Sequence, residues 1–218
     1  MKISDLILQI LLPGLWDTLY MVLISTLFAV IIGFLPAIII VITDDKGLKP
    51  NRYVNKILDF IINLLRSFPF IILMIAIFPL TKLIVGTTIG KNAAIVPLTI
   101  GAAPFAARVI ESALKEVDSG IIEAAKAFGA STTQIIFKVM LKEALPSIVL
   151  GITLTVISVI GYSAMAGTIG AGGLGDIAVR YGYQRFKTDI MIYTVIILIL
   201  VVQIMQSIGN IAYKRLSK

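Results

Sequence analysis

Ile190–Val202 has the sequence IMIYTVIILILVV and contains no charged residue. Each Leu, Ile, Phe or Val favours insertion into a bilayer by about 0.3 to 0.6 kcal/mol, and along this stretch no charge offsets the gain. The apolar region around it, residues 189–212, reaches the roughly 20 residues that a helix needs to cross a hydrocarbon core about 30 Å thick. This stretch therefore predicts a helix that spans a membrane.

The composition of the whole chain extends this prediction. Of its 218 residues, 58% are hydrophobic and 14% are charged, and the mean hydropathy is +1.01, far from the composition of an ordinary soluble domain. Four more apolar runs have lengths near that of a span: residues 17–42, 57–80, 93–112 and 146–170. We therefore predict an all-α fold, a polytopic membrane bundle of five transmembrane helices.

The run at 93–112 differs from the others because it contains Pro97, Gly101 and Pro104. Proline removes a hydrogen bond from a helix interior. We expect a kinked span here, with the freed backbone groups facing protein or water rather than lipid.

The ends of the chain set the expected boundaries. Met1–Leu12 is too short and too lightly charged for a signal peptide with a cleavage site, so the first apolar run is expected to remain as a span. We divide the chain into an N-terminal segment at 1–12, a transmembrane domain at 13–212 and a cytoplasmic tail at 213–218.

The distribution of Lys and Arg predicts the orientation, because short cytoplasmic loops retain an excess of these residues. With the N-terminus outside and the C-terminus inside, the larger group of cations lies inside: Lys46, Lys49, Arg52, Lys56, Lys115, Lys126, Lys138, Lys142, Lys214, Arg215 and Lys218. The smaller group lies outside: Lys2, Lys82, Lys91, Arg180, Arg185 and Lys187. The net charge of +7 is thus interpreted as membrane topology. We expect no nucleic-acid partner, since the cations are dispersed between spans.

The residues that carry much of enzyme chemistry are missing. The chain has no Cys and no His, which excludes thiol catalysis, disulfides and the common zinc sites. Asp44 and Asp45 lie beside Lys46, as in a solvated or lipid-facing charge cluster. We expect no catalysis in this chain and no cofactor or metal bound by it.

Two glycine patterns resemble nucleotide sites without meeting their requirements. Gly170–Gly175 satisfies G-x-G-x-x-G but follows a membrane span instead of a strand. It is expected to be a flexible turn or, alternatively, a gating or partner-contact loop. Gly86–Asn92 has one residue too few between its glycines for a phosphate-binding loop, and Asn92 replaces the Ser or Thr that holds magnesium. Any ATP must therefore bind to another chain.

A polar segment, Asp118–Pro146, interrupts the apolar chain. A short amphipathic pattern precedes Gly129, and Ser131-Thr132-Thr133-Gln134 has the spacing of a capping box, which predicts a helix that starts at Ser131. The segment therefore predicts a helix, a tight turn and a second helix, and it resembles a docking element.

Polar residues inside the predicted spans have two open interpretations. Arg66 either faces the bundle or water, or it is a snorkelling residue near a helix end. A stripe along the fourth span either packs helices closely or lines a permeation path, and Met165 continues it as a side chain able to plug a passage. The stripe consists of Ser147, Gly151, Thr155, Ser158 and Tyr162. Gln203, Gln206 and Asn210 form a similar stripe in the fifth span, where interhelical hydrogen bonds are expected.

These motifs carry a resemblance to a known family. Glu123-Ala124-Ala125 with Gly129 four residues later, between the third and fourth spans, resembles the coupling motif of type I ABC importer permeases. The remaining landmarks resemble the methionine-importer permeases along nearly the whole chain: RSFPFIIL at 66–73, AIVPLTIGAAPF at 94–105, GYSAMAG at 161–167, the glycines of 170–175 and RYGY at 180–183. The family's Leu-Pro pair is displaced here to Leu145-Pro146, which concerns only how the second coupling helix ends.

The resemblance implies a function. Glu123, Ala124, Ala125 and Gly129 would couple the permease to a separate ATPase, and Met165, Ser158 and Tyr162 are candidates for the gate or path. The implied partners are a second copy of the chain, two ATP-binding cassette subunits that hold Mg-ATP, an extracellular methionine-binding protein contacting residues 81–92 and 171–188, and the lipid bilayer. The implied location is the bacterial cytoplasmic membrane, with multiple spans.

Three alternatives remain at this point. The permease could carry another small polar solute or amino acid. A secondary transporter or channel would need no ATPase, yet Asp59 and Glu111 both lie near predicted cytoplasmic ends instead of mid-membrane. A structural scaffold would leave Glu123 and Gly129 without a role.

Overall fold

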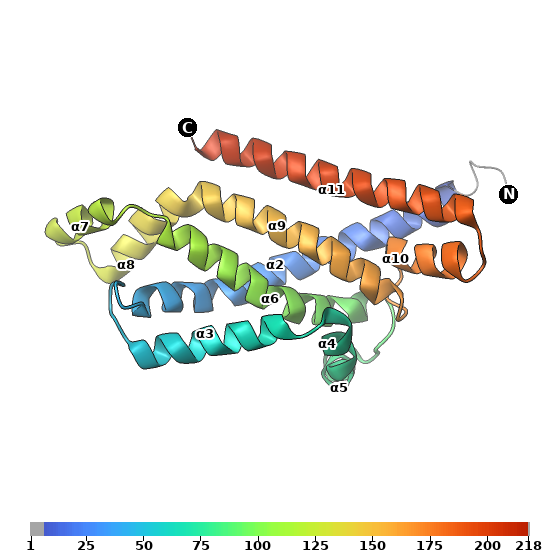
Figure 1. The fold of residues 1–218 in the computed structure, drawn as a ribbon, viewed down its shortest axis with the longest axis horizontal. Helices are drawn as coiled ribbons and strands as arrows, with labels where there is room; N and C mark the ends of the chain where they lie inside the picture. The colour runs from blue at the N-terminus through green and yellow to red at the C-terminus, as the bar shows by residue number, and fades with distance from the viewer. Residues whose placement is uncertain (1–6, 218) are drawn as a thin grey trace.

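The structure, a computed structural model, describes residues 7–217. Every regular element in that range is a helix (Figure 1). In chain order the elements are the π-helical turn η1 (Ile7–Leu11), α2 (Leu12–Thr43), α3 (Arg52–Ser67), α4 (Phe70–Ala76), α5 (Phe78–Val85), α6 (Lys91–Lys115), α7 (Ser119–Ala127), α8 (Thr132–Gln134), the π-helical turn η2 (Ile135–Met140), α9 (Leu141–Gly167), α10 (Gly173–Ile177), the π-helical turn η3 (Ala178–Tyr183) and α11 (Thr188–Leu216).

The predicted all-α membrane bundle is confirmed. Within the described residues, four helical stretches are long and apolar enough to cross a membrane: Ile7–Thr43, Lys91–Lys115, Thr132–Gly167 and Thr188–Leu216. A fifth crossing is obtained when α3 and α4 are counted together as one bent span. Of the N-terminal segment 1–12, residues 1–6 lie outside the described range, as does Lys218.

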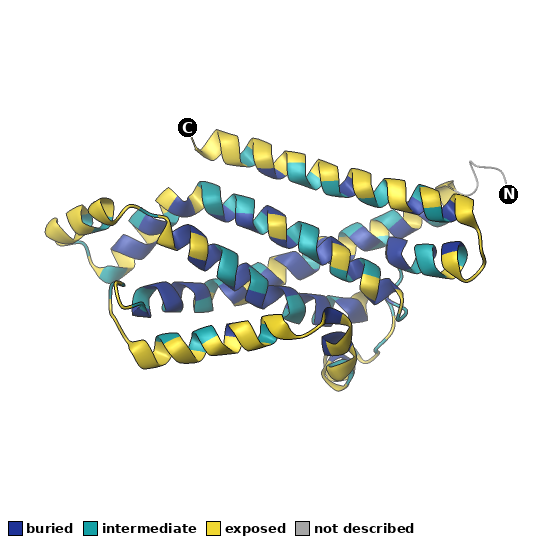
Figure 2. Cartoon of the chain, in the orientation of Figure 1, coloured by how far each residue is buried: buried dark blue, intermediate teal, exposed yellow. Residues whose placement is uncertain are grey.

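Helices α2, α6 and α9 form the core, and small residues allow their close packing. A Cβ atom added to Gly33 of α2 would lie 2.7 Å from the carbonyl oxygen of Ala103 and 2.7 Å from the amide nitrogen of Ala107. The two backbones therefore approach as closely as small-residue interfaces permit in membranes. In Figure 2 the buried residues concentrate on these helices, whereas α3 and α11 are largely exposed.

The second span is not the single continuous helix expected at residues 57–80. It begins earlier, at Arg52, and breaks between Ser67 and Phe70, where the axes of α3 and α4 differ by 99°. Pro69 explains the break, because a proline disfavours helical geometry in the preceding residue. Phe68 accordingly has an extended backbone, with φ −72° and ψ 128°. Arg66 therefore lies in the last turn of α3, directly beside the break.

Two other prolines do not interrupt their helices. Pro97 and Pro104 lie inside α6, which runs from Lys91 to Lys115 without a break. Both prolines are buried, so this part of the helix faces protein, as expected. Pro146 lies inside α9, and the helix that starts at Thr132 continues through it to Gly167. The second helix of the polar segment thus does not end at Leu145-Pro146.

The alternation of the spans sorts the connecting segments into two groups (Figure 1). One end of the bundle holds the loop after α2, the α7–α8 hairpin and the end of α11, and the opposite end holds α5, the end of α9, α10 and the start of α11. The larger group of cations named above belongs to the first end, apart from Lys218, which lies outside the described residues. The sequence therefore grouped the segments correctly, whichever side of the membrane each end occupies.

The glycine-rich segment after α9 is packed rather than free. A turn at Thr168–Gly170 ends α9, and the expectation of a flexible turn over Gly170–Gly175 is wrong because α10 (Gly173–Ile177) begins within it. The amide of Leu174 then donates a hydrogen bond of 2.8 Å to Oγ1 of Thr18 in α2, and Leu174 is fully buried. Gly173 has φ +77° and lies so close to Thr18 that a Cβ atom would be 2.7 Å from Oγ1. This segment is therefore fixed against α2.

Candidate functional site

The α7–α8 hairpin, residues 118–134, is built by local sequence signals. Oδ1 of Asp118 accepts hydrogen bonds from the amides of Gly120 at 2.7 Å and Ile121 at 3.3 Å, and so caps the start of α7. Ser131 and Gln134 form the predicted capping box at the start of α8. The predicted sequence of helix, turn and helix is confirmed.

Gly129 makes the turn between the two helices possible. Its φ of +75° is in the left-handed region, which glycine adopts without the clash that a Cβ atom causes. The amide of Gly129 donates to the carbonyl of Lys126 at 2.9 Å, and the amide of Ala130 donates to the carbonyl of Ala125 at 3.1 Å. This pair of bonds is a Schellman motif, which satisfies the last carbonyls of α7.

The tip of the hairpin is open on most sides. Within the described residues α7 has no buried residue, and the helix projects at one extremity of the bundle (Figure 1). Glu123 and Ala124 are exposed and Ala125 is half-buried, so the small side chains leave the helix surface low enough for a partner to approach closely. Glu123 forms no ion pair with the described residues.

Phe128 is a feature that sequence reasoning missed. Its side chain, at the end of α7, is 92% exposed, and an exposed aromatic side chain is the kind of anchor that dominates binding at protein interfaces. The sequence could have indicated this side chain, because Phe128 is the bulky apolar residue directly before the glycine of the turn.

The base of the hairpin is joined firmly to the bundle. Ile122, Ala125 and Ala130 pack against a buried apolar cluster that includes Ile135 and Met140 of η2. α8, η2 and α9 form one continuous helical stretch, Thr132–Gly167, which connects the hairpin directly to the fourth span.

A network of ion pairs lies beside this end of the bundle and links α3 to α6. One amino nitrogen of Arg108 is 2.7 Å from Oδ1 of Asp59 and donates to Oδ1 of Asn63 at 2.9 Å. The other is 2.8 Å from Oε2 of Glu111, whose side chain is 5% exposed. Sequence reasoning placed Asp59 and Glu111 near the same end but did not pair them, because pairing across two helices depends on their packing.

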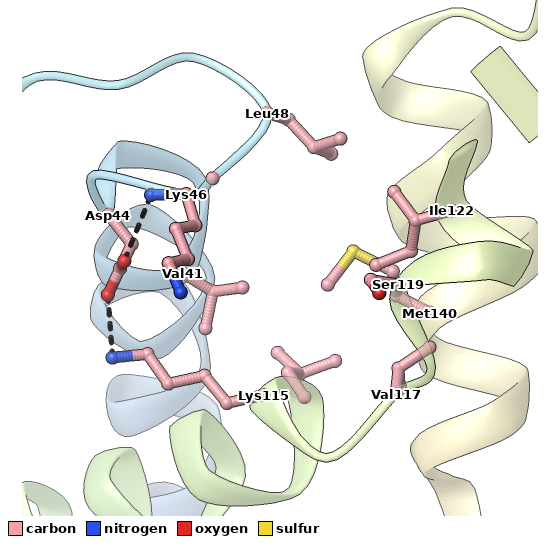
Figure 3. A pocket seen from close by; sticks show the side chains of 11 residues that line it. Val41, Asp44, Lys46, Leu48, Lys115, Val117, Ser119, Ile122 and Met140 are labelled. Atoms are coloured by element: carbon pink, nitrogen blue, oxygen red, sulfur yellow. Dashed lines mark hydrogen bonds and ion pairs between the residues drawn. The ribbon is translucent and has the colours of Figure 1, made fainter.

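The network continues to the loop after α2 (Figure 3). The ammonium of Lys115 is 3.0 Å from Oε1 of Glu111 and 2.8 Å from Oδ2 of Asp44. The hydrogen bond from Lys115, together with one of 3.2 Å from the amide of Lys46, holds the pKa of Asp44 below its ordinary value. Asp44 is thus paired with Lys115 and remains partly exposed, with 33% of its side chain accessible, which agrees with the predicted charge cluster.

A cavity separates this loop from the hairpin. Its volume is about 310 Å³, and it lies between Val41 and Leu48 on one side and Ile122 and Met140 on the other (Figure 3). The base of α7 and the loop after α2 thus border the same cavity.

Comparison with known proteins decides the family. Residues 29–218 match the family described as "Binding-protein-dependent transport system inner membrane component". The chain belongs to this family. The resemblance seen in the motifs is thereby confirmed, and the hairpin residues and the candidate path residues all lie within the matched part.

Related permeases are similar over most of their length. The "Probable D-methionine transport system permease protein MetI" of Vibrio cholerae serotype O1 is 52% identical over 207 residues, which cover 95% of this chain and 92% of that protein. The "Methionine import system permease protein MetP" of Bacillus subtilis is 46% identical over 170 residues, 78% of this chain and 77% of that protein.

Solved structures agree with the fold. A chain from the "Inward facing conformations of the MetNI methionine ABC transporter" matches with a TM-score of 0.96 and 41% identity over the whole of both chains. A chain from the "Crystal structure of an amino acid ABC transporter with histidines" matches with a TM-score of 0.77 and 18% identity over 94% of this chain and 92% of that one. The second match shows the shared fold alone.

In this permease the polar stripe of α9 divides into two parts. Gly151 and Thr155 are buried, and a Cβ atom on Gly151 would lie 3.0 Å from Cβ of Val109 in α6, so this part packs helices. Tyr162 is half-buried, and its ring stacks on Phe70 of α4 with centroids 4.6 Å apart. Ser158 and Met165 lie on the same side of α9 as Tyr162 by helical spacing.

Met165 and the stripe of α11 complete the predicted set. The side chain of Met165 is 47% exposed in the single chain, so the described residues do not close around it. In α11, Nε2 of Gln206 donates to Oδ1 of Asn210 at 3.4 Å. That bond lies within one helix, so the interhelical bonds expected from this stripe remain a prediction.

Proposed function

We propose that this chain is the transmembrane permease subunit of an ABC importer that carries methionine, as both the L and the D isomer, across the bacterial cytoplasmic membrane. Two copies of the chain would enclose the path between them. Two separate ATP-binding cassette subunits would hold and hydrolyse Mg-ATP, and an extracellular binding protein would deliver the solute. The substrate follows from the relatives, whose names specify methionine transport.

One observation carries the mechanical part of the proposal: the exposed α7 tip stands on a rigid base. Glu123, Ala124 and Phe128 offer an anionic group, a flat surface and an aromatic anchor to a partner's groove. Closure of the two ATPase subunits would move both tips, and each tip would carry its α9 as a rigid body. The bundle would thereby alternate between inward-open and outward-open arrangements.

The proposed orientation places the hairpin end in the cytoplasm and the opposite end outside. The supporting observation is that the described members of the larger group of cations share the hairpin end. The segments 81–92 and 171–188 share the opposite end and would contact the binding protein. The chain has no Cys, so a single cysteine can be placed at Thr87 or at Lys126. Labelling of intact cells with a membrane-impermeant maleimide then shows which of the two positions faces outward. Labelling of Lys126→Cys from outside would contradict the orientation.

Reconstitution tests the function directly. The chain, its cognate ATPase and its binding protein are placed in liposomes, and uptake of labelled L-methionine is measured with and without ATP. We expect ATP-dependent accumulation that unlabelled L- and D-methionine reduce. Accumulation of a different amino acid but not methionine would show that the proposed substrate is wrong. Accumulation without the ATPase would indicate a secondary transporter.

Two variants test the coupling residues. Glu123→Arg reverses the charge at the tip, and Gly129→Val forces a β-branched residue into a left-handed conformation. Both are expected to reduce uptake at least tenfold while the ATPase subunits still hydrolyse ATP. Gly129→Asn is the matched control, since asparagine tolerates this conformation. Uptake at the wild-type rate in both variants would refute the coupling role of Glu123 and Gly129.

Met165 has its own test. If its side chain plugs the path, Met165→Ala should increase passive leakage of methionine from loaded liposomes in the absence of ATP. Ala166→Gly, one residue away and fully buried, is the control. Unchanged leakage in Met165→Ala would discard this residue as the gate.

A further inference from the structure

A second cavity lies at the break between α3 and α4. Its volume is about 130 Å³, and its walls include Arg66, Phe68, Phe70, Gly101, Phe105 and Tyr162. The cavity is small, so a compact solute suits it better than a nucleotide or a sugar chain. Three segments far apart in the sequence thus meet around it.

The cavity lies near the middle of the membrane. Gly101 is ten residues from the Lys91 end of α6, and Phe105 is ten residues from the Lys115 end. At 1.5 Å per residue, each lies about 15 Å from the nearer end of the helix. A helix that breaks at this depth is tolerated where its freed backbone groups face protein or a water-filled cavity.

Arg66 brings a permanent charge to this site. It forms no ion pair and no hydrogen bond with the described residues, in contrast to Arg108 on the neighbouring helix. An ionisable side chain within a membrane span is costly, and it marks a path for solutes more often than a structural contact. A guanidinium binds a carboxylate through two parallel hydrogen bonds, which is the pairing that Arg66 lacks in the isolated chain.

The remaining walls suit an apolar side chain. The rings of Phe70 and Tyr162 are nearly parallel, with an angle of 9° between their planes. Sulfur atoms and methyl groups make favourable contacts with aromatic rings. Gly101 allows this arrangement, because a Cβ atom there would lie 3.0 Å from Cδ2 of Phe70 and would push the ring into the cavity.

We propose that this cavity is a substrate site in the membrane path, where Arg66 binds the carboxylate of an amino acid and the Phe70, Phe105 and Tyr162 rings contact its thioether side chain. The inference rests on the proposed function and adds that the permease itself selects the solute. Since Tyr162 belongs to α9, movement of the hairpin would separate the Tyr162 and Phe70 rings and release the solute.

Direct binding tests the site. The permease with its ATPase subunits is placed in nanodiscs of neutral lipid without the binding protein, and binding of radiolabelled L-methionine is measured at equilibrium. We expect saturable binding that Arg66→Gln weakens at least tenfold and Arg66→Lys weakens less. Methioninol, which lacks the carboxylate, should compete poorly against the wild type.

Matched variants separate the site from general damage. Arg52→Gln makes the same change in the first turn of α3 and should bind like the wild type. Gly101→Ala should weaken binding, whereas Gly161→Ala, whose Cβ atom meets nothing within 4 Å, should not. Basal ATP hydrolysis by each complex checks that it is assembled.

Each outcome decides the proposal. Absence of saturable binding to the wild type, or equal binding by wild type and Arg66→Gln, would overturn the site. If the wild type still accumulates methionine in the complete reconstituted system, only the site has failed and the proposed function stands. If it accumulates another amino acid instead, the proposed substrate has failed, and the same variants are then measured with that solute.

Discussion

Helices α6 and α11 are both long enough to span the membrane, yet they occupy opposite environments. In their most apolar 18-residue windows, 61% of α6 is buried inside the chain and only 17% of α11. The more hydrophobic of the two helices is α11. Hydrophobicity therefore marks the surface available to lipid or to another subunit, and the core of the bundle is built from smaller and more polar residues.

The difference extends to the charged residues. In α6, Arg108, Glu111 and Lys115 lie on one face at helical spacing and are paired. In α11 the charges lie only near the two ends, at Asp189, Lys214 and Arg215. The charged residues of α6 thus obtain their partners from α3 and from the loop after α2.

The largest expected effect breaks this pairing. Glu111→Ala leaves Arg108 and Lys115 without their shared, buried carboxylate, and it should lower the free energy of unfolding by about 3 to 5 kcal/mol. Asp189→Ala removes a carboxylate from the exposed start of α11 and should cost about 0.3 to 1 kcal/mol. SDS titration in mixed micelles measures both. Equal losses in the free energy of unfolding would contradict the conclusion that the charged residues of α6 contribute more to stability than those of α11.

The second test removes apolar side chains of similar size. Leu98 of α6 is fully buried and Ile204 of α11 is 55% exposed. Leu98→Ala should lower the free energy of unfolding by about 2 to 5 kcal/mol, and Ile204→Ala by less than about 0.5 kcal/mol. The same titration gives both values. A large loss for Ile204→Ala in the isolated chain would show that α11 depends on its apolar surface for folding.

The third test probes the contact between α2 and α6. Gly33→Ala places a methyl group against the backbone at Ala103 and Ala107, and such overpacking costs about 1 to 3 kcal/mol. Gly161→Ala adds the same methyl group where space is open and should stabilise the helix by about 0.5 to 1 kcal/mol. Changes of opposite sign in the free energy of unfolding would confirm the close approach of α2 and α6. An increase in both variants would refute it.

The smallest expected effect concerns pH at the edge of the α6 network. Because the pKa of Asp44 is lowered in the folded chain, its contribution to stability is present above the ordinary value of about 3.9 and is lost as the pH falls through the lowered folded value. The difference in unfolding temperature between wild type and Asp44→Asn should therefore shrink below about pH 4. Asp45→Asn, in the same loop, is the control. A difference that stays constant from pH 7 to 3 would contradict the ion pair with Lys115.

The sequence predicted those parts of the fold that depend on local patterns. The apolar runs predicted the spans, and Ser131 and Gly129 predicted the boundaries of the hairpin, because caps and turns are set by neighbouring residues. The break at Phe68 followed from Pro69 by an equally local rule, but the long apolar run around it favoured one continuous span.

The candidate site was less predictable because it depends on packing between helices. No spacing in the sequence indicated that Phe70 stacks on Tyr162, or that Arg66 and Gly101 line the same cavity. The pairing of Arg108 with Asp59 also joins residues 49 positions apart. By contrast, the motif alone predicts the proposed coupling residues, since all of them lie on a single hairpin.

The unbroken helix from Thr132 to Gly167 has a mechanical consequence. Its 36 residues measure about 54 Å at 1.5 Å per residue, well over the thickness of the hydrocarbon core. A tilt of only about ten degrees at one end would therefore displace the other end by about 9 Å. On the proposed function, a small rotation of this helix at the hairpin end would therefore be enlarged at its opposite end, where it would help to open a passage for a small molecule.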